Sequence, residues 1–361
     1  MAEPLSVVWI TGAGFSKFLG APLLRELLTK RSLQKVCAVY RHEGFLSSEI
    51  QAGWSHVTTL YKRGCGTYWE HAEEFLERLD LAIAYKSQAR HLLEIFSVLS
   101  ISKDDEEGRV AVNEDDLRKV HDHAHRLMAA EVTAFLAEAD PKLERWDPYL
   151  TWARSLTKKD TVLTFNYDRV PEILLEETGK LDIPHEFHPT QQQDPDGATV
   201  LKMHGSVNWR IHEGRIRERD RHVCDVANFD EIAMATPGPR KRRMIQTQPF
   251  QAIWSSAQYA VANAGALVIV GYSMPPTDAA TKKWLVTALQ LWVEKHPNSG
   301  LCVHLVLGPD QSTGHARRLR GLLRSISTLF SVMTWHLGAE DFLGLLSRAQ
   351  LGDYRPELDR D

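Results

Sequence analysis

Apolar residues are concentrated in short runs that alternate with longer amphipathic stretches. The clearest runs occupy residues 5–11 (LSVVWIT), 161–165 (TVLTF), 266–271 (ALVIVG) and 301–307 (LCVHLVL). Each is rich in β-branched residues and bounded by turn-forming residues, so each predicts a strand that is buried on both faces. Weaker apolar patterns at 200–204 and 231–236 predict two further strands.

Helical spacing of apolar positions follows most of these strands. It predicts helices after Pro22 (LLRELLTKRSLQKV), after Val170, and at residues 248–264, 277–294 and 314–324. Strands that alternate with helices predict a parallel sheet with helices on both faces. The expected fold class is therefore α/β, a Rossmann-like parallel sheet.

A long helical stretch separates the first strand from the second. Residues 69–139 keep an apolar stripe through most of their length, which is too much chain for a simple crossover. We therefore expect a helical insertion or subdomain at about residues 56–157. It would interrupt one domain spanning residues 1–350, with a C-terminal tail at 351–361.

Composition excludes several classes of protein. The chain is 43% hydrophobic and 25% charged, as in ordinary globular proteins, and its net charge of -4 gives no reason to expect nucleic acid as a direct partner. No run is long enough to span a bilayer, and the start lacks a secretory layout, so we expect a cytoplasmic protein without membrane association. Four scattered cysteines without a C-x-x-C pair argue against a zinc site.

The first strand ends in a glycine-rich segment, GAGFSKFLGAPLLR at residues 12–25. Glycines at a strand-to-helix junction let the backbone approach a phosphate, whose charge the amides of a helix start would stabilise. Lys17 stands where the dinucleotide fingerprint has its third glycine, so this segment alone is equally compatible with a tight turn.

Polar motifs also follow the second strand. TFNYD places Asn166 and Asp168 beyond its carboxyl end, where doubly wound sheets collect ligands. The same residues could simply cap the next helix. MHGSVNW then places His204 on a turn, where a histidine can serve as a general base, although a lone histidine is more often structural.

Two later strands have similar endings. IVGYSMPPTD could turn Gly271 and Ser273 toward a ribose or phosphate, while Thr277 or Asp278 could cap the following helix. The strand at 301–307 ends at Gly308. None of these motifs is decisive alone.

In this order and spacing the motifs resemble the sirtuin-like NAD-binding family. Its G-A-G-x-S-x-x-x-G-x-P-x-x-R segment is matched at residues 12–25, its T-x-N-x-D at 164–168, its H-G-S at 204–206 and its G-T-S-type turn at 271–273. The resemblance implies that Asn166 and His204 are catalytic. It implies that the NAD-binding residues are Gly12, Ala13, Gly14, Phe15, Ser16, Arg25, Asp168, Gly205, Ser206, Gly271, Tyr272, Ser273 and Gly308.

The wording of the motifs points to a subgroup. TFNYD, HGSVNW and GYSMPPTD look like bacterial sirtuin-like proteins that hydrolyse NAD in anti-phage defence. Deacylases of the family hold a four-cysteine zinc module between the H-G-S and G-T-S segments, where this chain has only Cys224. Leu23 and Leu24 also replace the Asp-Phe that deacylases carry in P-D-F-R. The resemblance thus implies NAD as substrate and no metal.

The implied reaction splits NAD into nicotinamide and ADP-ribose. Asn166 would position water, Asp168 would orient the carboxamide, and His204 would bond a ribose hydroxyl or act as base. Two other readings stay open: a protein deacylase that uses the same pocket, and a non-catalytic sensor of NAD or ADP-ribose.

An unregulated NAD hydrolase would poison its own cell, so control by self-assembly or by a separate protein is expected. Relatives of the defence type are paired with helicase-like ATPases, short Argonautes or nucleotide-sensing proteins. Residues 69–139 lie outside the shared motifs and are the predicted assembly surface. The basic run at 240–243 (RKRR) and the His121–His125 pair are both predicted to be solvated.

Overall fold

The computed structural model describes most of the chain. The described residues are 5–42, 46–100, 114–137, 139–184, 197–218, 232–236, 238–275, 278–309, 314–345 and 348–352. Cys224 and residues 353–361 of the predicted tail lie outside them. In the described part, no helix is both long and apolar enough to cross a membrane.

A seven-stranded sheet of order β3-β4-β2-β1-β7-β8-β9 organises the fold, and every pair of neighbours is parallel. This confirms the predicted Rossmann-like α/β class. The central strands are buried on both faces because almost all their side chains are apolar. The strands are β1 (Val7–Thr11), β2 (Thr161–Thr164), β3 (Leu181–Asp182), β4 (Ala198–Lys202), β7 (Ala266–Val270), β8 (Leu301–Val306) and β9 (Phe330–Trp335).

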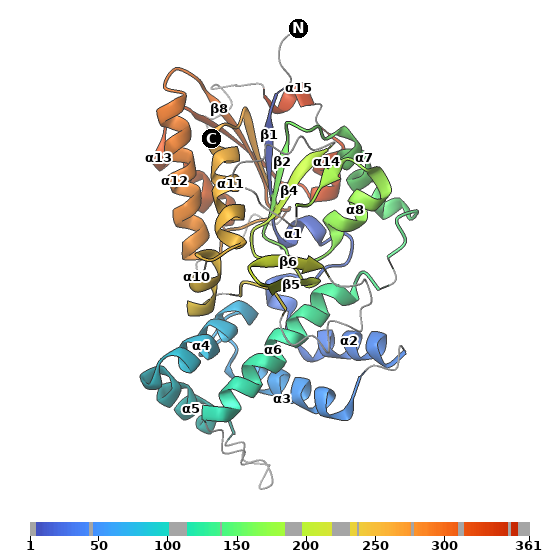
Figure 1. The fold of residues 1–361 in the computed structure, drawn as a ribbon, viewed down its shortest axis with the longest axis vertical. Coiled ribbons are helices and arrows are strands. Elements are labelled where there is room, and N and C mark those ends of the chain that lie inside the picture. Colours follow the sequence, from blue (N-terminus) through green and yellow to red (C-terminus); the bar gives the residue numbers. More distant parts are fainter. Residues whose placement is uncertain are drawn as a thin grey trace.

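Helices cover both faces of this sheet (Figure 1). One layer consists of α11 (Phe250–Ala262), α12 (Ala279–Lys295) and α13 (His315–Ile326). The other consists of α7 (Asp147–Ser155), α8 (Val170–Thr178) and α14 (Ala339–Leu343). Short helices at α1 (Ala13–Ser16), α10 (Pro239–Ile245) and α15 (Arg348–Leu351), with the 3-10 turn Glu144–Trp146, complete this half.

A second half of the molecule is helical and lies below the sheet in Figure 1. It contains α2 (Lys30–His42), α3 (Ser48–Gly64), α4 (Ala72–Ala84), α5 (Lys86–Ser100) and α6 (Glu114–Ala134). Its apolar cluster, with Trp54 and Phe75 fully buried, is separate from the cluster around the sheet. The cluster begins near Leu27, earlier than the predicted insertion, while α7 packs with the sheet because Tyr149 and Trp152 contact Phe15.

The helix predicted after Pro22 is interrupted. A 3-10 turn covers Leu24–Glu26, and Leu28 then takes a left-handed conformation with φ 55° before α2 begins. Its N–H donates to the carboxylate of Glu131 on α6 at 3.0 Å. Tertiary contact with the buried Glu131 thus accompanies a break that local helical spacing does not reveal.

Two short strands form a hairpin where the halves meet. They are β5 (Trp209–His212) and β6 (Arg215–Glu218), which pair antiparallel. The strand expected at 231–236 is wrong for its described residues, where Met234 forms only an isolated bridge with Gly205. This segment instead lies against the helical core, because Met234 belongs to its apolar cluster.

Glu131 supplies a pH test of the helical core. The residue is 4% exposed, and burial raises the pKa of its carboxyl from its usual 4.5 to about 8. A carboxyl with a raised pKa binds more protons in the folded state than in the unfolded state. It therefore makes the free energy of unfolding fall as the pH rises from the unfolded-state pKa to the folded-state pKa. We expect the free energy of unfolding of Glu131→Gln, relative to that of the wild type, to rise by about 1.4 kcal/mol for each pH unit in this range.

Urea denaturation of both proteins between about pH 5 and pH 8 checks this difference. Glu94→Gln on α5 is the matched control, because the Glu94 side chain is 69% exposed and should show no such slope. A difference in the free energy of unfolding between Glu131→Gln and the wild type that does not change with pH would contradict the raised pKa.

Candidate functional site

The carboxyl ends of β1, β2, β4, β7, β8 and β9 border one cavity of about 770 Å³. From β1 the sheet continues to β2 on one side and to β7 on the other, so the cavity lies at the topological switch point. The sequence motifs converge here because each follows a parallel strand. From those motifs the cavity is lined by Gly12, Ala13, Gly14, Arg25, Asn166, Asp168, His204, Gly271, Tyr272, Ser273 and Gly308.

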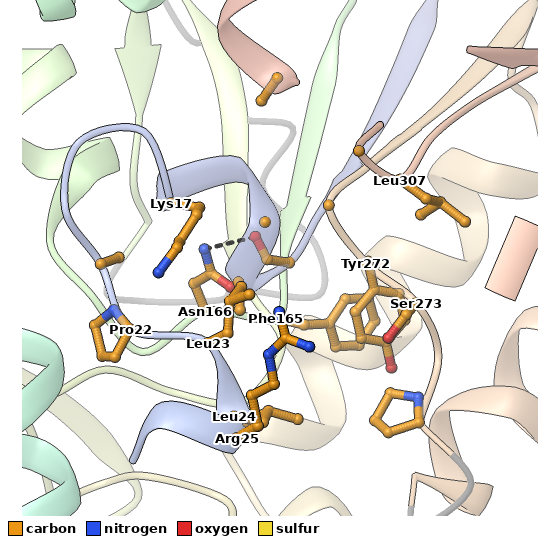
Figure 2. Close-up of a pocket in the computed structure, with 18 of the residues that line it drawn as sticks. Lys17, Pro22, Leu23, Leu24, Arg25, Phe165, Asn166, Tyr272, Ser273 and Leu307 are labelled. Carbon is orange, nitrogen blue, oxygen red and sulfur yellow. Dashed lines mark hydrogen bonds between the residues drawn. The ribbon is translucent and has the colours of Figure 1, made fainter. Parts of the chain in front are cut away.

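The end of the glycine-rich segment and the helical half supply the rest of the lining. Pro22, Leu23, Leu24 and Arg25 form one side, and Figure 2 shows the Arg25 side chain among the residues that line the cavity. The helical half contributes Leu27, Glu70, His71, Glu73 and Val132. Both halves of the molecule therefore enclose the candidate site.

The glycine-rich loop is locked against the β7 loop. A Cβ on Gly14 would lie 2.7 Å from Gly271 Cα, and one on Gly271, at φ +66°, would lie 2.2 Å from Phe15 N. The Gly12 amide donates to the Val270 carbonyl, the Gly14 amide to the Gly271 carbonyl, and the Phe15 amide to the Gly12 carbonyl. Close packing thus explains these glycines, and these three amides are already occupied within the protein.

Asn166 lies on the cavity floor with 8% of its surface exposed. Its Nδ2 donates to the Gly12 carbonyl at 3.0 Å, the bond drawn in Figure 2, and to Ser16 Oγ at 3.1 Å. Because both partners accept from the amide nitrogen, the carboxamide oxygen is the atom left to accept from a ligand or water.

Asp168 accepts a backbone bond beside α8 and also lines the cavity. Its Oδ1 accepts from Val170 N at 3.0 Å at the start of α8, which is the capping interpretation, and the residue also lines the cavity. Burial raises the pKa of its carboxyl, against the opposing effects of this bond, Lys202 and Ser16.

His204 is buried and held on all sides. Its Nε2 lies 2.9 Å from Lys241 Nζ and 3.3 Å from Asp278 Oδ2, and its ring also bonds the Phe165 backbone. Burial and the Lys241 cation lower the pKa of the imidazole, although Asp278 opposes this. The ring is therefore neutral near pH 7, and Nε2 accepts from the lysine ammonium.

Lys241 and Asp278 are site residues that the sequence reading missed. Lys241 is 4% exposed, so the solvated-run prediction is wrong for this member of the basic run. Its Nζ donates to Asp278 Oδ1 at 2.7 Å, and Tyr272 OH donates to Asp278 Oδ2 at 2.8 Å. Asp278 also accepts from Thr281 N, which confirms it as the cap of α12. No local signal distinguishes Lys241 from its basic neighbours.

Four predicted binding residues do not line the cavity: Phe15, Ser16, Gly205 and Ser206. Phe15 packs in the sheet core, and Ser16 lies beneath Asn166. Ser206 Oγ accepts from Lys202 Nζ and bonds Asn208 Oδ1. This serine therefore belongs to a buried polar network behind the site.

Three cationic side chains that line the cavity could bind a ligand without breaking a buried ion pair. Arg25 has no hydrogen bond or ion pair within the described residues. Lys17 pairs with Glu26 at 2.5 Å, an exposed pair of the kind that contributes little to stability. Arg318 Nη2 donates to the Ser273 carbonyl at 3.2 Å. These groups could meet the negative charge of a phosphate.

The arrangement combines a neutral buried histidine, a carboxamide with a free oxygen, a buried carboxyl and several cations around one cavity. Such a set can bind an anionic, hydroxyl-rich ligand and hold a water molecule against it. No protein-family model matches this chain, and a search of curated proteins finds no match either.

Proposed function

We propose that this chain is an NAD glycohydrolase, which cleaves NAD to nicotinamide and ADP-ribose. The observation that carries the proposal is the convergence of Asn166 and His204 on the cavity that the glycine-rich loop borders. A cavity of about 770 Å³ lies within the usual size range of small-molecule sites. Its position at the switch point is where dinucleotides bind in related folds.

The cations of the cavity suit the pyrophosphate of NAD. Because the amides of Gly12, Gly14 and Phe15 donate within the protein, the glycine loop offers shape more than charge. Arg25 and Lys17, which both line the cavity, provide the charge.

The nicotinamide end is assigned to Asn166, Asp168 and His204. Asn166 Oδ1 holds a water molecule, and Asp168 faces the carboxamide. The water oxygen bonds to the anomeric carbon as the bond from that carbon to nicotinamide breaks. The electron pair of the broken bond leaves with the nicotinamide nitrogen. The water proton passes to solvent or to His204, whose neutral ring can accept it once Nε2 is released from Lys241.

The same proposal includes a cellular role. On the resemblance to bacterial anti-phage proteins, the reaction would deplete NAD in an infected cell, and a homo-oligomer or a separate regulatory protein would control it. This chain would then be the effector of a defence system. Residues 69–139, which include α4, α5 and α6, would be the assembly surface.

Incubation of the purified protein with NAD, alone and with the product of a neighbouring gene, tests the proposal. We expect nicotinamide and ADP-ribose in equal amounts by chromatography. His204→Ala should reduce their formation by about 100-fold or more, as for loss of an acid–base group. His91→Ala is the matched control because the His91 side chain is 61% exposed. Cleavage of an acetyl-lysine peptide without NAD hydrolysis would overturn the proposal.

A further inference from the structure

A second cavity, of about 1210 Å³, lies on the far side of Lys241 from the first. It is bordered by α4, α6, α10 and the start of α12. Asp278 lines both cavities, whereas His204 lines only the first and Lys241 only the second. The bond between Lys241 and His204 therefore joins the two cavities.

The second cavity is lined by five cationic side chains and four carboxyl groups. The guanidinium groups of Arg118, Arg242 and Arg243 line it without a hydrogen bond or ion pair in the described part of the chain. Three of its carboxyl groups have other partners: Asp80 accepts from Arg240 N, Asp122 Oδ1 lies 3.4 Å from His121 Nδ1, and Asp278 accepts from Lys241 Nζ. Burial raises the pKa of the fourth, Glu77, and the nearby charge of Arg242 opposes this.

Two buried polar atoms of the lining residues have no partner among the described residues. His121 is 1% exposed and its Nε2 is unbonded, as is Oδ1 of Asp80, which is equally buried. The prediction that His121 is solvated is therefore wrong. An unmade hydrogen bond at a buried group has a free-energy cost, which a bound molecule beside it would remove.

We propose that this second cavity binds a small molecule that carries phosphate groups. Phosphate oxygens match the fork of donors on each arginine, and three unpaired arginines suit more than one phosphate group. The His121 ring and the Asp80 carboxylate supply a donor or acceptor for the remainder of the ligand.

Occupancy of this site also regulates the first cavity, a step that rests on the proposed function. An anion beside α10 attracts the Lys241 ammonium away from His204, which frees Nε2 to accept a bond from ribose or a proton. In the absence of the ligand, Lys241 occupies that lone pair. The bound anion is therefore an activator.

Calorimetric titration with sodium tripolyphosphate tests binding. We expect Arg242→Ala/Arg243→Ala to weaken the Kd by about tenfold or more, a loss of about 1.4 kcal/mol. Arg31→Ala/Arg90→Ala is the control, with the same change of charge on exposed arginines of the helical half. Saturating ADP-ribose should not weaken binding of tripolyphosphate, because it occupies the first cavity, and the proposed coupling should tighten the Kd. Displacement by ADP-ribose, an equal Kd in the Arg242/Arg243 variant, or no binding would overturn the site.

A parallel titration with ATP distinguishes a nucleotide from a bare polyphosphate, since tighter binding of ATP indicates contacts beyond the phosphates. For regulation, tripolyphosphate should raise the rate of NAD cleavage by about threefold or more in the wild type. It should leave the rate of Arg242→Ala/Arg243→Ala unchanged. Inhibition, or activation of both proteins, would overturn the regulatory step. If neither the wild type nor the variant cleaves NAD, with or without tripolyphosphate, the proposed function fails while the binding result stands.

Discussion

Replacement of Asn166 by alanine is expected to reduce NAD cleavage by about 100-fold or more, the usual effect of removing one polar group that acts on the reacting centre. The structure directs the Asn166 amide nitrogen to Gly12 O and Ser16 Oγ, so its oxygen is oriented toward the cavity. Alanine removes that oxygen and leaves the attacking water without its acceptor.

Steady-state assay of nicotinamide release measures this effect. Asn263→Ala is the matched control and should retain full activity, because Asn263 is exposed and does not line the cavity, whereas Asn166→Ala also removes the two bonds of the Asn166 amide. Loss of the two bonds should itself lower the free energy of unfolding by about 1–3 kcal/mol, so folding is checked first by circular dichroism. A folded Asn166→Ala protein with near-normal turnover would remove Asn166 from the mechanism.

The largest effect on stability is expected at Lys202, which is fully buried on β4. Its Nζ donates to Glu172 Oε1 at 2.7 Å, to the Asp168 carbonyl at 2.7 Å and to Ser206 Oγ at 2.5 Å. Lys202→Met fills similar space but leaves the Glu172 carboxylate without its cation in a buried position. We expect a loss of about 3–5 kcal/mol in the free energy of unfolding.

Urea denaturation measures this loss, and the double variant Lys202→Met/Glu172→Leu identifies its cause. Removing both charges should recover part of the stability, because a buried charge without a partner costs more than an absent pair. Lys295→Met, a surface change, should cost less than about 0.5 kcal/mol. A single Lys202→Met variant that is as stable as this control would show that the pair contributes nothing.

Buried strands of the sheet could be predicted because each is a continuous apolar run between turn residues. β9 was not predicted, since Ser331 and Thr334 interrupt its apolar pattern and it lies at the sheet edge. β3 has only two residues, too few for any periodicity. Local patterns also hide the break at Leu28, which involves the distant Glu131.

The candidate site was predictable to the extent that it follows strand ends. Parallel strands bring their carboxyl ends to one edge, so Asn166 and His204 could be expected to meet although they are distant in sequence. Lys241 could not be found this way, because it lies on a helix within a basic run and only the fold decides which side chain turns inward. Ser206 was assigned to binding for its place in a motif, but the fold turns it toward Lys202.

The separate apolar core of the helical half has a consequence for how the cavity opens. Sub-global unfolding follows the boundaries of such cores, so α2–α6 can exchange their amide hydrogens without loss of protection in the sheet. Each such event removes the wall formed by Leu27, Glu70, His71, Glu73 and Val132, whereas β2 and β4, which precede Asn166 and His204, belong to the core of the sheet. Deuterium uptake by the helical half is therefore a measure of how often the cavity lies open to solvent.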